Sequence, residues 1–238
     1  RRPAFALQVM REALRRCVDE QAAAIDAKAM DGRTRHLEVL CDQYAYDAQS
    51  GLSAAQVPAA HHKQLLAWCA TRPPPSQPRV GPEPLRALGS VTAELALAER
   101  CGAQLRAVLV GEVDAQSVLF PEGSLELVRA VYEDGLLASV YNACVVAAVG
   151  SMVAQLKAEC QVRVLEVGAG TGGTTTSVLP ALCGRCSAYL FTDVSGSFLR
   201  QARRRFGEHR FVEYHLLNID ADPRLQGFAL GRCELVIA

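Results

Sequence analysis

The fold of this chain is decided by residues 162–176, which read VRVLEVGAGTGGTTT. The first part is a short, nearly continuous apolar run, typical of a parallel strand buried on both faces. Its apolar residues are Val162, Val164, Leu165 and Val167. A cluster of glycines follows and leaves no Cβ atoms in the way of a bound ligand. These are Gly168, Gly170, Gly172 and Gly173. Residues 174–179 then predict a helix whose free N–H groups face the ligand, so the stretch predicts a nucleotide-type pocket.

Two classes of cofactor fit this loop. Gly168, Gly170 and Gly173 satisfy the dinucleotide pattern GxGxxG, so the spacing alone does not exclude NAD. Glu166 stands two residues before the first glycine, where a carboxylate is costly to bury without a cationic or hydrogen-bonding partner. S-adenosylmethionine offers an ammonium and a sulfonium, which gives an acidic residue beside the loop a reason to exist. We therefore favour S-adenosylmethionine, and pairing of Glu166 with a local arginine is the alternative.

The composition argues against several classes of protein. Half of the 238 residues are apolar, enough for a substantial core, and the 25 basic residues equal the 25 acidic ones. This balance gives no electrostatic case for a nucleic acid or an anionic membrane as partner. The nine cysteines are scattered, and we expect no signal segment and no apolar run of membrane-spanning length. We expect a reduced, cytoplasmic protein, cut from a longer chain because it starts at Arg1 and stops inside an apolar run.

Residues 1–135 predict a helical subdomain. Apolar spacing indicates helices over about residues 4–30, 36–49, 59–70, 92–109 and 124–133, with a loop at 111–123. Six prolines within residues 71–84 break the pattern and predict a stiff surface connection. His61 and His62 are adjacent on a helix and therefore point in different directions, which makes them a poor metal pair.

Residues 136–238 predict the second domain. A long apolar helix is expected over 136–158, followed by alternating strands and helices, the pattern of a parallel, doubly wound sheet. Strands are expected at 162–167, 188–193, 211–219 and 235–238, and helices at 174–182 and 197–206. Right-handed crossovers bring the carboxyl ends of such strands to one edge, so ligand-binding residues should collect there.

Two further strand ends carry polar residues. Asp193 ends an apolar strand about 20 residues beyond the last glycine, the separation expected for a carboxylate that binds a ribose diol. Capping of the next helix is an alternative role that is compatible with the first. Asn218 ends the next strand, where its carbonyl oxygen is placed to accept a hydrogen bond from an adenine amino group while Ile219 covers the ring. Because Asn-x-Asp also makes ordinary turns, both interpretations of Asn218 stay open.

Several motifs together resemble one known family. They are LEVGAGTGGTT at 165–175, VLPAL at 178–182, FTDVSGSFL at 191–199, LNIDADPRLQGF at 217–228 and ELVIA at 234–238. They are similar to the S-adenosylmethionine-dependent C-methyltransferase domains embedded in type I polyketide synthases. Upstream, residues 99–114, 119–124 and 140–142 resemble the helical lid of the same domains. The resemblance implies an α/β fold, with an N-terminal helical lid followed by the first half of a Rossmann-like class I methyltransferase sheet.

The resemblance also implies a set of site residues. Glu166 and the glycines would hold the methionine part of the cofactor, and Asp193 the ribose. The implied cofactor-binding set is Glu166, Gly168, Ala169, Gly170, Thr171, Gly172, Asp193, Val194, Asn218 and Ile219. The family usually has LDI where this chain has Leu217-Asn218-Ile219, so weaker adenine binding is expected. Tyr141 and Asn142 are expected in the substrate-side wall, with core packing as the alternative for Tyr141.

The implied reaction moves the sulfonium methyl to the α-carbon of a β-ketoacyl group. This group would be held as a phosphopantetheine thioester on an acyl carrier protein, among neighbouring synthase domains. Because the carbon lies between two carbonyls, a side-chain base can remove its proton and the enolate can attack the methyl in line. In the family a His supported by a Glu is the base, and we expect both beyond the end of this sequence. None of the five histidines takes that position, so we assign no catalytic residue and expect the isolated chain to be inactive.

Other functions are weighed against this one. A structural domain that keeps the fold without catalysing methylation stays open because the base is not assigned. An NAD-dependent oxidoreductase is disfavoured by Glu166 and by the lid resemblance. No metal site is expected, because Cys183 and Cys186 form a lone CxxC without two further ligands at matching spacing.

Overall fold

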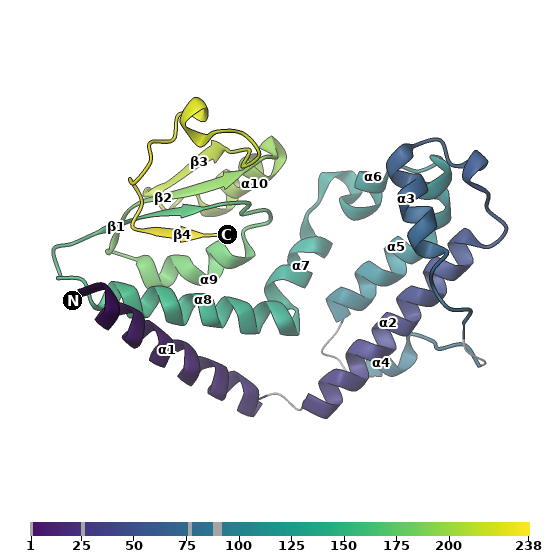
Figure 1. The fold of residues 1–238 in the computed structure, drawn as a ribbon, viewed down its shortest axis with the longest axis horizontal. Coiled ribbons are helices and arrows are strands. Elements are labelled where there is room, and N and C mark those ends of the chain that lie inside the picture. The colour runs from purple at the N-terminus through teal and green to yellow at the C-terminus, as the bar shows by residue number, and fades with distance from the viewer. Residues whose placement is uncertain (1, 25–26, 76–77, 88–91) are drawn as a thin grey trace. The chain divides into compact units, whose positions relative to one another are not determined.

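The computed structural model describes residues 2–24, 27–75, 78–87 and 92–238, which form two compact units (Figure 1). One unit comprises Arg1–Gln21 and Leu137–Ala238, and the other comprises Ala22–Leu136. Residues 1–21, expected in the helical subdomain, group with the sheet unit. Cys17 of this segment is buried, and the pKa of its thiol is raised by burial and by the neighbouring Cys144 of the same unit.

The helical unit is built from short and medium helices. They are α2 (Ala27–Gln49), η1 (Ala54–Gln56), α3 (Ala60–Cys69), α4 (Glu83–Ala87), α5 (Thr92–Val110), α6 (Ala115–Leu119), η2 (Pro121–Gly123) and α7 (Glu126–Asp134). One expectation for this part of the chain was wrong. The segment 111–123 is no plain loop, because Asp114 accepts a hydrogen bond from the Ser117 N–H and so caps α6. The helix expected over 4–30 covers α1 (Arg2–Ala24) and the first residues of α2, and residues 25 and 26 lie outside the described residues.

Helices α2 and α5 form the centre of the helical unit. They approach closely at Gly102, where an added Cβ would lie 2.3 Å from the Tyr44 ring. Leu40, Leu85 and Leu95 join α2, α4 and α5 in one small core. The proline-rich segment is held on α2 at Val80, which donates to Gln43 Oε1 at 2.9 Å and accepts from Gln43 Nε2 at 2.8 Å. These two bonds resemble strand pairing and hold the segment to α2 at Val80. Residues 76 and 77 of the segment lie outside the described residues, and its last two residues, 83 and 84, begin α4, where no helix was expected.

The sheet unit contains four parallel strands in the order β3-β2-β1-β4. Its elements are α1, α8 (Leu136–Ala154), β1 (Val162–Glu166), α9 (Gly173–Leu182), β2 (Cys186–Asp193), α10 (Gly196–Phe206), β3 (Val212–Leu216), η3 (Pro223–Gln226) and β4 (Leu235–Ile237). The strand order reverses direction between β1 and β4, so the carboxyl end of β1 lies at a switch point of the sheet. The α/β class predicted from the sequence, with a helical N-terminal region and a parallel sheet, is confirmed.

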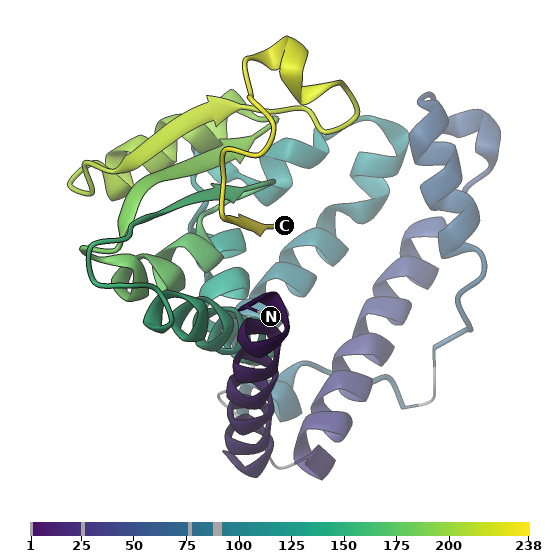
Figure 2. The same ribbon diagram turned by 60° about the vertical axis from the view of Figure 1, so that its left-hand side comes forward.

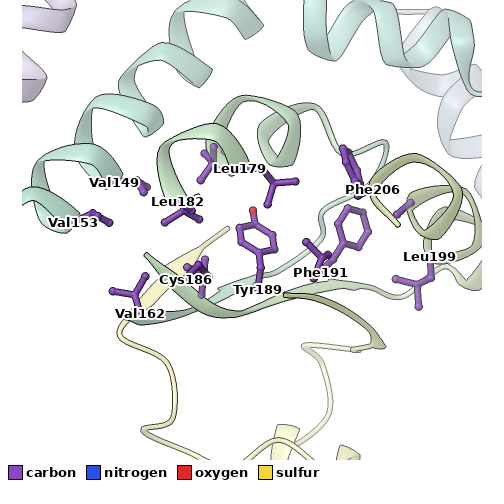
Figure 3. Packing of buried hydrophobic residues seen from close by; sticks show 14 residues of the cluster. Val149, Val153, Val162, Leu179, Leu182, Cys186, Tyr189, Phe191, Leu199 and Phe206 are labelled. Carbon is purple, nitrogen blue, oxygen red and sulfur yellow. The ribbon is translucent and has the colours of Figure 1, made fainter. Parts of the chain in front are cut away.

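Helices α8 and α9 lie along one face of the sheet, and α1 runs beside α8 (Figures 1 and 2). Val149 and Val153 of α8, together with Leu179 and Leu182 of α9, pack against Tyr189 and Phe191 of β2 (Figure 3). Helix α8 ends at Ala154 instead of residue 158. The last turn is closed by Arg185, whose Nη2 donates to the carbonyls of Val153, Leu156 and Lys157.

One helix reaches membrane-spanning length. By length and composition alone, residues Leu137–Ala154 would suffice to cross a membrane, contrary to the expectation that no apolar run does so. In the structure, Val149 and Val153 of this helix are buried against the sheet. Only 17% of this stretch is buried, so packing against the sheet accounts for part of its apolar character.

Candidate functional site

The glycine loop begins where β1 ends. Gly168, Gly170 and Gly172 have φ values of 65°, 56° and 81°, a left-handed conformation that other residues adopt at a cost of about 1–2 kcal/mol. Their surroundings differ. A Cβ added at Gly172 would lie 2.7 Å from the Phe206 ring of α10, whereas one added at Gly168 would meet no atom within 4 Å. The loop is thus packed against α10 at its end and open at its start.

Glu166 is buried, and its direction follows from the pleat of β1. Val162, Val164 and Glu166 alternate with less buried residues, so all three face the helix layer. Glu166 keeps 3% of its surface exposed, and its Oε2 accepts from Thr175 Oγ1 at 2.5 Å and from the Tyr189 hydroxyl at 2.8 Å. Burial raises the pKa of Glu166 to about 7, and the two hydroxyl donors act in the opposite direction.

Asp193 joins the end of β2 to the glycine loop. It is 6% exposed; its Oδ2 accepts from the Gly170 N–H at 2.9 Å and its Oδ1 from the Ser195 N–H at 2.7 Å. Ser195 directly precedes α10, so the Asp193 carboxylate binds both the glycine loop and the residue before that helix. Next to it, Val194 is exposed at the same strand end. The structure therefore brings Glu166, the glycine loop and Asp193 to one edge of the sheet.

The carboxyl end of β3 is followed by a turn that contains Asn218. Strand β3 ends at Leu216 instead of Ile219, and the Leu217 N–H donates to the Asp193 carbonyl at 3.1 Å. Asn218 follows in a turn, where its Oδ1 accepts from the Asp220 N–H at 3.0 Å, and Ile219 is 68% exposed. The turn anticipated as the alternative for Asn218 is thus formed. Both residues lie at the predicted edge, one and two positions beyond a backbone bond to β2.

The expected substrate-side residues have different environments. Asn142 of α8 is buried, and its Oδ1 accepts from Thr174 Oγ1 at 3.0 Å in the first turn of α9. Tyr141 is 68% exposed, which excludes the core-packing alternative within the described residues. Asn142 therefore lies beside the helix that follows the glycine loop.

Sequence reasoning missed the residues that hold this edge together. Thr175 and Tyr189 are fully buried donors to Glu166, and the buried Thr192 donates to the Glu166 carbonyl at 2.5 Å while its own carbonyl accepts from Ala169 N–H at 2.9 Å. On α10, Arg205 Nη1 donates to the Thr171 carbonyl at 3.3 Å. The available signal was register: Tyr189 pairs with Val164, which puts it on the same face as Glu166.

The residues at this edge suit an organic cation with a hydroxylated sugar. The open side of the loop at Gly168 leaves room for a ligand, and two buried carboxylates flank it. Among the described residues, no group of three or more histidine, cysteine or acidic side chains is arranged to hold a metal ion. The predicted ribose and methionine positions are therefore chemically compatible with the loop.

The chain is similar in sequence to a methyltransferase family and to polyketide synthases. Residues 165–237 match the family described as "Methyltransferase domain". "Polyketide synthase ThaQ" of Burkholderia thailandensis is 39% identical over 149 residues, which are 60% of this chain and 7% of that protein. The chain thus spans less than a tenth of this relative's length.

Solved structures extend the similarity to nearly the whole chain. The CurJ carbon methyltransferase matches with a TM-score of 0.81 and 28% identity, over 97% of this chain and 70% of that one. The trans-methyltransferase CalH, solved in complex with SAH, matches with a TM-score of 0.67 and 25% identity, over 89% of this chain and 63% of that one. These findings confirm the resemblance inferred from the sequence motifs.

Proposed function

We propose that this chain, a methyltransferase domain resembling the carbon methyltransferases of polyketide synthases, binds S-adenosylmethionine at its glycine loop and serves C-methylation of a β-ketoacyl thioester. One observation carries the proposal. The carboxylates of Glu166 and Asp193, both buried, stand on either side of an open glycine loop at the switch point of the sheet. A ligand with an ammonium group and a ribose gives both carboxylates a role, whereas a nicotinamide dinucleotide offers Glu166 no ammonium group to pair with.

Each residue of the proposed site has a distinct task. Asp193 binds the ribose hydroxyls, and Glu166 binds the ammonium of the methionine part. The turn from Gly168 to Gly172, with Ala169 and Thr171, lets the backbone approach the ligand closely. Asn218 and Ile219 contribute to the adenine side, with the neighbouring Val194. CalH with SAH supports a ligand of this class in the same fold.

The proposed acceptor is the α-carbon of a β-ketoacyl chain on an acyl carrier protein. The bound cofactor supplies an electrophilic methyl group. Tyr141, exposed on α8, and Asn142, bonded to Thr174 at the start of α9, form part of the substrate side in this proposal. No residue of this chain is assigned as the base. The relative ThaQ, a polyketide synthase of which this chain spans 7%, supports a setting within a larger synthase. In this proposal the synthase is cytoplasmic, its other domains are the neighbours, and neither a nucleic acid nor a membrane is a partner.

Isothermal titration of S-adenosylmethionine into the chain tests the cofactor assignment. We expect micromolar binding that is lost in the Glu166→Ala, Asp193→Ala double variant. A matched control, Glu213→Ala with Asp222→Ala, removes two acidic residues outside the loop and should bind normally. NADH serves as the competitor ligand and should give no heat. Absence of S-adenosylmethionine binding to the folded chain would contradict the proposal.

Methylation itself is tested in the intact synthase that contains this domain. A β-ketoacyl carrier protein should gain one methyl group at the α-carbon, detected by mass spectrometry, and an acyl carrier that lacks the β-carbonyl should not. Cofactor binding without methyl transfer would favour a structural domain over an active enzyme.

A further inference from the structure

Glu166 is held in the core by two neutral hydroxyls. Thr175 Oγ1 and the Tyr189 hydroxyl both donate to Oε2, and no described residue donates to Oε1. Both donors are completely buried, so the geometry of this oxygen is fixed by α9 and β2. Oε1 is therefore the oxygen that a ligand at the glycine loop can engage.

The groups around Glu166 carry no positive charge. Thr175 of α9 and Tyr189 of β2 donate to Glu166, and Phe191 of β2 and Ile237 of β4 pair with it in the sheet. Cys186, at the start of β2, interacts electrostatically with Tyr189. Burial raises the pKa of Cys186 to about 11 and that of Tyr189 above its usual range. Neither group changes its charge near neutral pH, so Glu166 is the titrating group of this cluster there.

We propose that Thr175 and Tyr189 are positioning residues that fix one oxygen of Glu166 in the core, so that binding of the cationic cofactor is coupled to loss of a proton from this carboxyl group. The inference rests on the proposed function. The ligand's ammonium requires a carboxylate, and the ligand-free core favours the neutral acid, as the raised pKa of Glu166 to about 7 indicates. Binding therefore releases up to one proton to solvent, and no other reactant is needed.

The coupling has a defined sign. Below the pKa of Glu166 in the ligand-free protein, each fall of one pH unit weakens binding up to tenfold, because the carboxyl group must first lose its proton. Removing either hydroxyl leaves the carboxylate with one donor fewer, so a Tyr189→Phe or Thr175→Val protein should ionise at higher pH and bind more weakly at pH 6.5. Thr175→Ser keeps the hydroxyl and should bind as the wild type does.

Titration of S-adenosylhomocysteine into the full chain between pH 5.5 and 7.5 tests the inference. This ligand carries the ammonium, which stays mostly protonated throughout this range. Wild-type affinity should rise roughly 10- to 30-fold across the range, and that of Glu166→Gln should stay within about twofold. At pH 6.5, the binding enthalpies measured in phosphate and in imidazole buffer should differ by the amount expected when the wild type releases most of one proton to the buffer. This last measurement needs no variant.

Tyr214→Phe is the matched control for the hydroxyl variants, because Tyr214 on β3 has a buried hydroxyl without a hydrogen-bond partner among the described residues. It should bind as the wild type does at every pH. Tyr189→Phe should bind about three- to tenfold more weakly at pH 6.5 and approach the wild type at pH 7.5. Wild-type binding that does not change with pH, or hydroxyl variants that match Tyr214→Phe throughout, would overturn the inference and leave the proposed function intact. No binding at any pH would overturn both.

Discussion

The ends of β1 and β2 differ from the end of β3 in how their polar residues are held. Glu166 and Asp193 are 3% and 6% exposed, and each accepts at least one hydrogen bond from a residue on another element or loop. Asp193 also accepts from the Ser195 N–H two residues away. Among the described residues, the side chain of Asn218 has only a bond of this local kind, from the Asp220 N–H, and lies beside the exposed Ile219. The first two ends are fixed by the sheet, and the third is fixed by its own loop.

The way in which each strand end is held indicates which parts of the site are formed before a ligand binds. Residues fixed by strand register keep their positions because moving them would disrupt the core. Residues fixed by a local turn can rearrange at the cost of one or two exposed hydrogen bonds. We therefore expect substitutions at the first two ends to affect both stability and cofactor binding, and substitutions at the third to affect chiefly the loop.

The largest effect is expected at Gly172. Gly172→Ala combines a φ of 81° with a Cβ only 2.7 Å from the Phe206 ring, so it should cost about 3 kcal/mol or more of unfolding free energy. Gly168→Ala shares the left-handed backbone but meets no atom within 4 Å, and should cost only about 1–2 kcal/mol. Urea unfolding of both variants measures the difference. Equal losses would show that packing against α10 does not constrain the loop.

The next largest effect is expected in how the free energy of unfolding changes with pH, because Glu166 is buried. Its folded pKa of about 7 lies above the ordinary 4.5, so between these values the folded state holds a proton that the unfolded state has lost. Stability from this group is therefore present below pH 4.5 and declines as the pH rises to 7, by about 3 kcal/mol in total. Glu166→Gln lacks this decline.

Comparing wild type and Glu166→Gln at each pH isolates the contribution, since other titrating groups are common to both. The variant should gain relative stability between pH 5 and 8 and bind the cofactor more weakly than the wild type at neutral pH. A constant stability difference over that range would contradict the buried neutral acid.

A direct comparison of the two kinds of strand end uses Asp193→Ala and Asn218→Ala. The first leaves the N–H groups of Gly170 and Ser195 without their acceptor and should cost about 2 kcal/mol, with cofactor affinity lowered roughly 100-fold or more. The second removes one exposed turn bond and should cost about 0.5 kcal/mol, with affinity lowered only a few-fold. Thermal unfolding and titration of S-adenosylhomocysteine provide both measurements, and similar affinity losses would remove the distinction.

The sequence predicted the strand, glycine loop and helix at 162–182 almost to the residue, because a buried parallel strand and a glycine cluster leave strong local signals. Prediction from the sequence failed for elements that are too short to show a periodic pattern and for elements that are placed by tertiary contacts. Helix α6 has five residues, too few for a periodic pattern, and depends on the cap at Asp114. Helix α1 belongs to the sheet unit, where its Cys17 is buried. The sequence of an amphipathic helix does not say which neighbouring surface its apolar side will pack against.

The candidate site shows the same division. Glu166, Asp193 and the glycines were identified because carboxylates and glycines at strand ends are chemically conspicuous. Thr175 and Tyr189 were missed because a threonine in a helix and a tyrosine in an apolar strand look like ordinary core residues. Only the pairing of Tyr189 with Val164, two residues before Glu166, places its hydroxyl within reach of the carboxylate.

The smallest effect is expected at Gln226, which holds the loop after β3. Its Oε1 accepts from the Asn218 N–H at 2.8 Å, and its Nε2 donates to the Asn218 carbonyl at 2.8 Å and the Ala221 carbonyl at 3.2 Å. Gln226→Ala should cost only about 1 kcal/mol, because these exposed backbone groups can bond to water instead. Amide exchange should quicken within residues 217–227 and stay unchanged in β1 and β2. Gln226→Glu keeps the acceptor for Asn218 and loses the donor, so it should protect the Asn218 amide but leave the rest of the loop exchanging quickly. Faster exchange that spreads into β2 would mean that the third strand end is coupled to the sheet and is not held by its own loop.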